Sequence, residues 1–138
     1  MSGYSGTPLI KKLGIKSGFN TAFVNAPSGF ASGFNLPADV FSNSRKPLDF
    51  ALLFVRSEKQ LQQRFSKLAG KLKPNGMLWV SWPKKSSGVE TDLSFTNVQA
   101  IGLGAGLVDV KVCAINETWS GLKFVYRLQD RPRQTKRG

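Results

Sequence analysis

Leu48-Asp49-Phe50-Ala51-Leu52-Leu53-Phe54-Val55 is apolar at every position except Asp49. An apolar run of this length is typical of a strand that is buried on both faces, as in the parallel sheets of α/β proteins. Residues 57–73 follow with apolar side chains at helical spacing, namely Leu61, Phe65, Leu68 and Leu72. Residues 77–82 then form a second apolar run. This order predicts a strand, a helix and a parallel strand.

Upstream of this unit the sequence predicts a short helix and a first strand. Thr7 and Pro8 suit the start of a helix, and Gly14 suits its end. Residues 20–25 are expected to form a strand, and residues 39–41 a brief one.

Downstream, a second long helix is expected over residues 91–106, with Thr91 or Asp92 as its cap. Strands are expected over residues 108–115 and 122–128, and the short connection between them favours an antiparallel hairpin. The predicted fold class is α/β: a single Rossmann-like domain whose sheet is reduced and mostly parallel, with an antiparallel hairpin at its C-terminal edge.

The composition is that of one basic domain. The chain has 138 residues, enough for a single core, and a formal net charge of +12. Residues 1–130 are expected to form the domain and residues 131–138 a basic, disordered tail. No apolar run approaches the roughly 20 residues that cross a bilayer, and no secretory signal is evident. One cysteine, Cys113, suits a reducing compartment, so we expect a cytoplasmic protein with a buried, inert thiol.

The usual catalytic groups are few. The sequence has no histidine and one cysteine, which excludes histidine-based triads and thiolate metal clusters. The close acidic pair, Glu90 and Asp92, suits a helix start better than a metal site. The glycine-rich segment 102–107 ends a predicted helix instead of opening one, so it indicates close packing and not a phosphate loop. We therefore predict no catalytic and no metal-binding residues.

Several segments resemble class I S-adenosylmethionine-dependent methyltransferases. Residues 13–25 look like the lead-in and first strand of that fold, and residues 47–80 look like its fourth strand, fourth helix and fifth strand. Over residues 3–130 the chain also resembles a bacterial family catalogued as a domain of unknown function. The matching segments are residues 3–9, 24–27, 82–93 and 111–122.

The resemblance implies a cofactor loop after the first strand. Methyltransferases of this class carry an acidic residue and several glycines there, whereas this chain has Asn25-Ala26-Pro27-Ser28. The segment between residues 30 and 47 is also too short for a full second and third strand–helix unit. We therefore expect no bound cofactor.

Ligands of such sheets bind beyond the carboxyl ends of the parallel strands. Three predicted loops meet there, at residues 25–30, 82–88 and 116–121. Lysines, hydroxyls and the expected helix start near Thr91 suit an anionic small molecule or a phosphorylated partner. The candidate residues are Asn25, Ser28, Trp82, Lys84, Lys85, Ser86, Ser87, Thr91, Glu117 and Trp119.

Three functions remain open at this level. The leading prediction is a small non-catalytic binding or regulatory protein on a degenerate methyltransferase-like scaffold. The first alternative is a methyltransferase that uses S-adenosylmethionine through a divergent site. The second is a basic protein that associates weakly and without sequence preference with nucleic acid, through the helix at residues 57–73 and the tail. No membrane association is expected.

Overall fold

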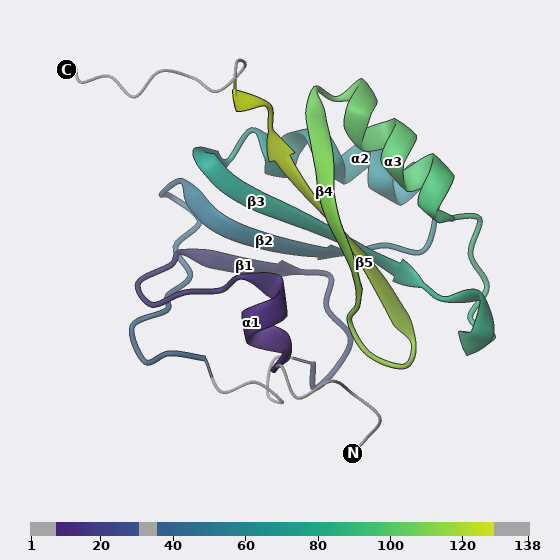
Figure 1. Ribbon diagram of the computed structural model, residues 1–138, viewed down its shortest axis with the longest axis horizontal. Helices are drawn as coiled ribbons and strands as arrows, with labels where there is room; N and C mark the ends of the chain where they lie inside the picture. The colour runs from purple at the N-terminus through teal and green to yellow at the C-terminus, as the bar shows by residue number, and fades with distance from the viewer. Residues whose placement is uncertain (1–7, 31–35, 129–138) are drawn as a thin grey trace.

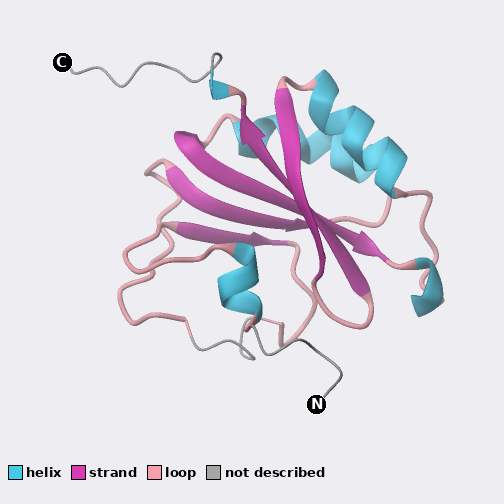
Figure 2. Cartoon of the chain, viewed as in Figure 1, coloured by secondary structure: helices cyan, strands magenta, loops and turns pink. Residues whose placement is uncertain are grey.

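The computed structural model describes residues 8–30 and 36–128, and these form one five-stranded sheet with helices on both faces (Figures 1 and 2). The strand order is β1-β2-β3-β5-β4. The strands are β1 (Thr21–Val24), β2 (Leu48–Phe54), β3 (Leu72–Pro83), β4 (Leu107–Ala114) and β5 (Trp119–Tyr126). The helices are α1 (Leu9–Leu13), α2 (Glu58–Ala69) and α3 (Phe95–Gly104), with a 3₁₀ turn at Lys85–Ser87.

The strand directions confirm the predicted fold class. β1, β2 and β3 are parallel to one another, and β5 is antiparallel to both β3 and β4. Four of the five strands thus run the same way, and β4 and β5 form the expected edge hairpin. None of the helices in the described part of the chain has the length and apolar character needed to cross a membrane.

Alternating side chains of the sheet build two cores. One core lies under α2 and α3, where Phe65 of α2 packs edge-on against Phe124 of β5 at a centroid distance of 5.1 Å. Gly102 of α3 is close to the same ring, since a Cβ there would lie 2.0 Å from Phe124. Close packing is therefore the role of this glycine, as its sequence context indicated. The second core lies under α1, where the Trp79 indole Nε1 donates to the Leu13 carbonyl oxygen at 2.9 Å.

β1 lies at the point where the chain changes direction across the sheet. Phe41 pairs in parallel with Asn20 through the Phe19 carbonyl and the Thr21 amide, which point to the outer edge of β1. The Asn20 carbonyl points the other way and accepts from the amide of Asp49, at the start of β2. The brief strand expected at residues 39–41 is thus a single bridge. From that bridge the chain crosses to the opposite edge of β1, so a topological switch point lies between β1 and β2.

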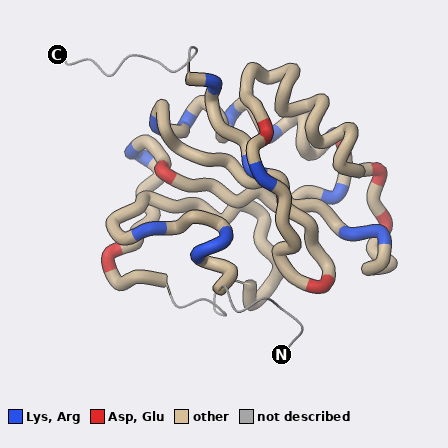
Figure 3. Tube along the Cα trace, viewed as in Figure 1, with Lys and Arg blue, Asp and Glu red and all other residues tan. Residues whose placement is uncertain are grey.

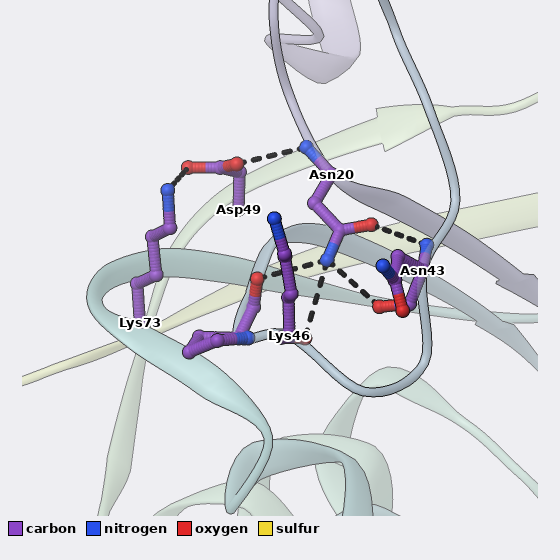
Figure 4. A network of polar contacts seen from close by, with 6 residues as sticks. Asn20, Asn43, Lys46, Asp49 and Lys73 are labelled. Carbon is purple, nitrogen blue, oxygen red and sulfur yellow. Dashed lines mark hydrogen bonds and ion pairs between the residues drawn. The ribbon is translucent and has the colours of Figure 1, made fainter.

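A polar network closes the amino end of β1 (Figure 4). The Asn20 side-chain amide donates to the carbonyls of Asn43, Lys46 and Pro47, and its oxygen accepts from the Asn43 amide at 2.8 Å. The Asp49 carboxylate accepts from the Asn20 backbone amide at 2.8 Å and pairs with Lys73 at 3.0 Å. One buried asparagine therefore fixes the loop that replaces the missing strand–helix units.

Several element boundaries differ from the sequence predictions, and β3 begins at Leu72, five residues before the predicted start at residue 77. α2 ends at Ala69 and not near Lys73, because the Leu48 amide donates to the Lys71 carbonyl and Leu72 already pairs in β3. β5 begins at Trp119, three residues before the predicted start at Leu122. At these boundaries, strand pairing includes residues that the local sequence pattern had assigned to a helix or a loop.

The start of α3 was also predicted wrongly. Ser94 is its cap and forms a reciprocal capping box with Asn97, so neither Thr91 nor Asp92 caps this helix. Asp92 instead accepts from the Glu58 amide at 2.8 Å, in the first turn of α2. Thr7, the expected cap of α1, and the expected tail at residues 131–138 lie outside the described residues; Gly14 ends α1 with φ 90° as expected.

Candidate functional site

A pocket of about 310 Å³ opens at the carboxyl ends of β1 and β2, at the switch point between them. The segment after β1, the end of β2, the first turn of α2 and the start of β5 all contribute to it. The lining residues are Asn25, Ala26, Pro27, Phe54, Arg56, Gln60 and Trp119. Its volume is at the lower end of the range of about 300–1,000 Å³ that is typical of small-molecule sites.

Asn25 shapes the β1 side of the pocket. Its φ of 62° is left-handed, the sole such angle among the described non-glycine residues. Asparagine tolerates this conformation better than most residues. Its Nδ2 donates to the Phe54 carbonyl at 3.1 Å, which ties the ends of β1 and β2 together. Asn25 thus makes the turn for which a cofactor loop of this fold would use glycine.

Arg56 is the charged residue of the described lining. Its guanidinium lies 6.0 Å from the centroid of the Trp119 ring, within reach of a cation–π contact. It forms no ion pair with any described acidic residue. Its backbone is held in place, since the amide donates to Gln60 Oε1 at 2.8 Å and the carbonyl accepts from the Thr91 hydroxyl. A fixed backbone and an uncommitted guanidinium suit the binding of a carboxylate or phosphate.

The apolar wall of the pocket is a rigid aromatic group. Phe54 packs edge-on against Trp119 at a centroid distance of 5.0 Å and against Phe30 at 4.8 Å. Ser81 of β3 pairs with both Phe54 and Gly121, so its side chain lies on the same sheet face, beside this group. The Ser81 hydroxyl is buried and has no hydrogen-bond partner among the described residues.

The structure gathers two of the residues that the sequence singled out, Asn25 and Trp119, at one pocket. A third, Thr91, lies behind it, bonded to the Arg56 carbonyl. The loops at residues 82–88 and 116–121 do meet, because the Lys84 amide donates to the Thr118 carbonyl at 2.8 Å. Yet the described lining contains none of the remaining candidates, which are Ser28, Trp82, Lys84, Lys85, Ser86, Ser87 and Glu117.

Two arguments for the lysine-rich loop fail on geometry. The helix N-terminus expected near Thr91 begins at Phe95 instead, where the Ser94–Asn97 capping box engages the exposed amides. Trp82 is 6% exposed and belongs to the core under α2 and α3, so it is a packing residue. Lys84 and Lys85 flank the start of a 3₁₀ turn, and Ser87 bonds back to the Lys84 carbonyl.

Sequence reasoning missed Phe54, Arg56 and Gln60. The signal that finds Arg56 is simple: it directly follows the most apolar strand, and parallel strands end at the edge where ligands bind. Gln60 carries no such signal, because its place at the pocket depends on how α2 leaves that edge.

Solved structures with a similar fold include several methyltransferases. One is a SAM-dependent methyltransferase from Aquifex aeolicus, with a TM-score of 0.57 and 15% identity over 84% of this chain and 86% of that one. Another is a ribosomal protein L11 methylase from Lactobacillus delbrueckii subsp. bulgaricus, with a TM-score of 0.59 and 12% identity over 86% and 75% of the chains. A third is magnesium protoporphyrin IX methyltransferase from Synechocystis PCC 6803 with bound SAH, with a TM-score of 0.56 and 9% identity over 86% and 78%.

These likenesses confirm the methyltransferase-like fold. No family model and no curated protein matches the chain, so the resemblance to a particular bacterial family stays a prediction. The leading functional prediction, a non-catalytic binding or regulatory protein, is corrected, because the similar structures include enzymes that carry SAM or SAH and so favour the divergent methyltransferase alternative. At such low identity the likeness is one of fold.

Proposed function

We propose that this protein is a divergent S-adenosylmethionine-dependent methyltransferase that holds its cofactor in the switch-point pocket. The observation that carries the proposal is the position of the pocket: it lies beyond the carboxyl ends of β1 and β2, and the chain crosses from one edge of β1, where Phe41 bridges to Asn20, to the other edge, where β2 pairs. Open α/β sheets bind their ligands at this kind of position.

The lining residues fit the cofactor in chemical type. Arg56 can bind the carboxylate of the methionine part, because it has no described acidic partner. Trp119 and Phe54 line the apolar side of the pocket, but they are 6% and 1% exposed, so the adenine base would contact only their edges. The side-chain oxygens of Asn25 and Gln60 can accept from hydroxyl or ammonium groups, the role that carboxylates take in the enzymes this chain resembles.

The lining residues also indicate which kind of methyl acceptor fits the pocket. Bound S-adenosylmethionine supplies an electrophilic methyl group to a nucleophile. The described lining includes no carboxylate and no histidine, so it offers no group that takes up a proton at neutral pH. An acceptor that is nucleophilic without prior deprotonation, such as an aromatic ring nitrogen with a free lone pair, therefore fits this site better than an alcohol or an alkylammonium group.

Calorimetric titration with S-adenosylmethionine tests the proposal, with Arg56→Ala as the site variant. We expect one-to-one binding by the parent and a loss of roughly tenfold to a hundredfold in Arg56→Ala, the effect of removing a hydrogen bond to a charged group. Arg64→Ala is the matched control, because Arg64 is equally cationic and exposed on α2 but does not line the pocket. No binding by the parent at millimolar cofactor, or equal losses in both variants, would contradict the proposal.

A further inference from the structure

Four lysines gather on the sheet face that carries α1. Lys111 of β4 and Lys123 of β5 stand directly opposite each other in the antiparallel ladder. The Lys111 Nζ donates to the carbonyl of Lys12, in the last turn of α1, at 3.0 Å, although the two residues are 99 positions apart. Lys16 follows α1. Figure 3 shows basic segments, in blue, in α1 and in the middle of the β4–β5 pair. We call Lys12, Lys16, Lys111 and Lys123 the lysine cluster.

The cluster has no negative partner within the described residues, since none of the four lysines forms an ion pair with an acid there. Acids that neighbour the cluster in sequence or in space are engaged elsewhere. Asp39 accepts from the Ser17 hydroxyl, and Asp109 accepts from Gln99 of α3 on the opposite side. Four lysines, of which Lys16 and Lys111 are exposed and Lys12 and Lys123 half-buried, therefore lie together without a counter-charge from the described chain.

The arrangement works against stability. Like charges directly opposite on neighbouring strands destabilise a sheet. Burial lowers the pKa of Lys123, and the charges of Lys111 and Lys16 lower it further. The fold does not need these charges, because the core of this face is built from Phe50, Trp79 and their apolar neighbours. A bound polyanion would remove the repulsion.

We propose that the lysine cluster binds the phosphate backbone of nucleic acid. Lysine presents a compact charge that contacts phosphates without reading bases, and several such charges on a rigid sheet match a chain of regularly spaced phosphates. An anionic membrane fits less well, because the two exposed valines beside Lys111 form no apolar surface with the cluster: Val112 pairs with Leu122 on the opposite face, and Val110 falls in the bulge of β4.

The cluster is separate from the switch-point pocket but shares its sheet face. Trp119 and Lys123 lie on the same side of β5, four residues and thus about 13 Å apart. A nucleic-acid strand on the cluster would extend toward the pocket. The inference goes beyond the proposed function and stands without it, since phosphate binding needs no cofactor.

The test is fluorescence anisotropy of a labelled oligonucleotide, single-stranded and duplex, without S-adenosylmethionine. The site variant is Lys111→Ala with Lys123→Ala. The matched control is Lys59→Ala with Lys67→Ala, which removes the same charge from exposed positions of α2 on the other face and keeps the same tail. Between about 50 and 200 mM salt, the logarithm of the binding constant for duplex DNA is plotted against the logarithm of the salt concentration. We expect this negative slope to become shallower by about 1.8 in the site variant, that is by about 0.9 for each lost phosphate contact. The control should keep a slope close to that of the parent.

Thermal unfolding separates loss of binding from loss of fold. The site variant should unfold at about the same temperature as the parent, because removing the repulsion between Lys111 and Lys123 offsets the loss of the hydrogen bond from Lys111 Nζ to the Lys12 carbonyl. Equal losses of binding in the two double variants would mean that affinity follows net charge, and would overturn the proposal. So would a parent protein that binds anionic vesicles or inorganic pyrophosphate through these lysines but shows no oligonucleotide binding.

Discussion

Two asparagines frame β1, and the structure uses them in opposite ways. Asn20, at the amino end, is 1% exposed and its side chain makes four hydrogen bonds to the loop at residues 43–47. Asn25, at the carboxyl end, is exposed and its side chain makes one hydrogen bond, at the wall of a pocket. At the amino end the asparagine side chain is buried and fully hydrogen-bonded, whereas at the carboxyl end it is exposed and can still form hydrogen bonds to a ligand.

The difference shows how a shortened fold is kept stable without closing its site. The chain lacks the units that would cover the outer edge of β1, and the amino-end network replaces them with hydrogen bonds from a single buried side chain (Figure 4). Because hydrogen bonds are concentrated there, the carboxyl edge can hold Arg56 without an acidic partner and Ser81 without a hydrogen-bond partner among the described residues. Substitutions at the two edges should therefore have different consequences.

The largest effect is expected for Asn20→Ala. The change leaves the Asn43 amide and the carbonyls of the loop without their partner, and each buried backbone group left unsatisfied costs about 1–3 kcal/mol. We expect the free energy of unfolding, measured by urea denaturation, to fall by about 3 kcal/mol. Asn43→Ala is the control and should cost under about 1 kcal/mol, because the network uses the Asn43 backbone while its side chain accepts one exposed bond from Arg45. Equal losses of unfolding free energy in Asn20→Ala and Asn43→Ala would contradict the view that the Asn20 side chain holds the network together.

Asp49→Ala should come second, with a loss of about 2 kcal/mol in the free energy of unfolding. Its carboxylate accepts from the Asn20 backbone amide and also pairs with Lys73, so two contacts disappear together. Lys73→Ala removes the ion pair alone. Since the Lys73 side chain is 43% exposed, that variant should lose less than about 1 kcal/mol. A larger loss for Lys73→Ala than for Asp49→Ala would show that the ion pair, and not the backbone bond, holds the amino end.

Ser81→Ala tests the open edge and should act in the opposite direction. Removing a buried hydroxyl that lacks a partner should leave the free energy of unfolding unchanged or raise it by up to about 1 kcal/mol. Titration of the same variant with S-adenosylmethionine tells whether the ligand uses this hydroxyl. A clear loss of stability without ligand would mean that Ser81 has a structural partner, and the contrast between the edges would weaken.

The smallest effect is expected for Asn25→Gly. Glycine adopts the left-handed φ of 62° freely, which offsets the loss of one hydrogen bond, so the change in unfolding free energy should stay below about 0.5 kcal/mol. Asn25→Ala should cost about 1 kcal/mol, because a Cβ without a polar group disfavours that conformation. If Asn25→Gly lowered the free energy of unfolding as much as Asn20→Ala, both ends of β1 would contribute equally to stability and the contrast between them would be wrong.

Local features predicted much of this fold. The apolar run at residues 48–55 became β2, Ser57 caps α2 as its position before the helical pattern indicates, and Gly14 ends α1. Each of these depends on neighbours within a few residues, so the sequence pattern carries the information directly. Asp49, the one polar residue of that run, has a structural role through its contacts with Asn20 and Lys73.

The candidate site was predictable only in part. The rule that parallel strands end at the ligand-binding edge led to Asn25 and Trp119, which the structure brings to one pocket. It also drew attention to Lys84 and Lys85, which follow a strand that ends farther along the sheet. Asp92 shows the limit most clearly: its position suggested a cap for α3, but its carboxylate accepts from the amide of Glu58 in the first turn of α2, 34 residues earlier.

By itself the sequence determined the types of element, their order along the chain and the basic character of the protein, because helical and strand periods and charge are local properties. Only the tertiary structure decided which ends of the strands and helices lie next to one another. It joined Asn25, Arg56 and Trp119 in one pocket and set Lys111 against both Lys123 and the end of α1. These neighbours follow from the strand order β1-β2-β3-β5-β4, which depends on how two cores pack on one sheet and not on any local pattern.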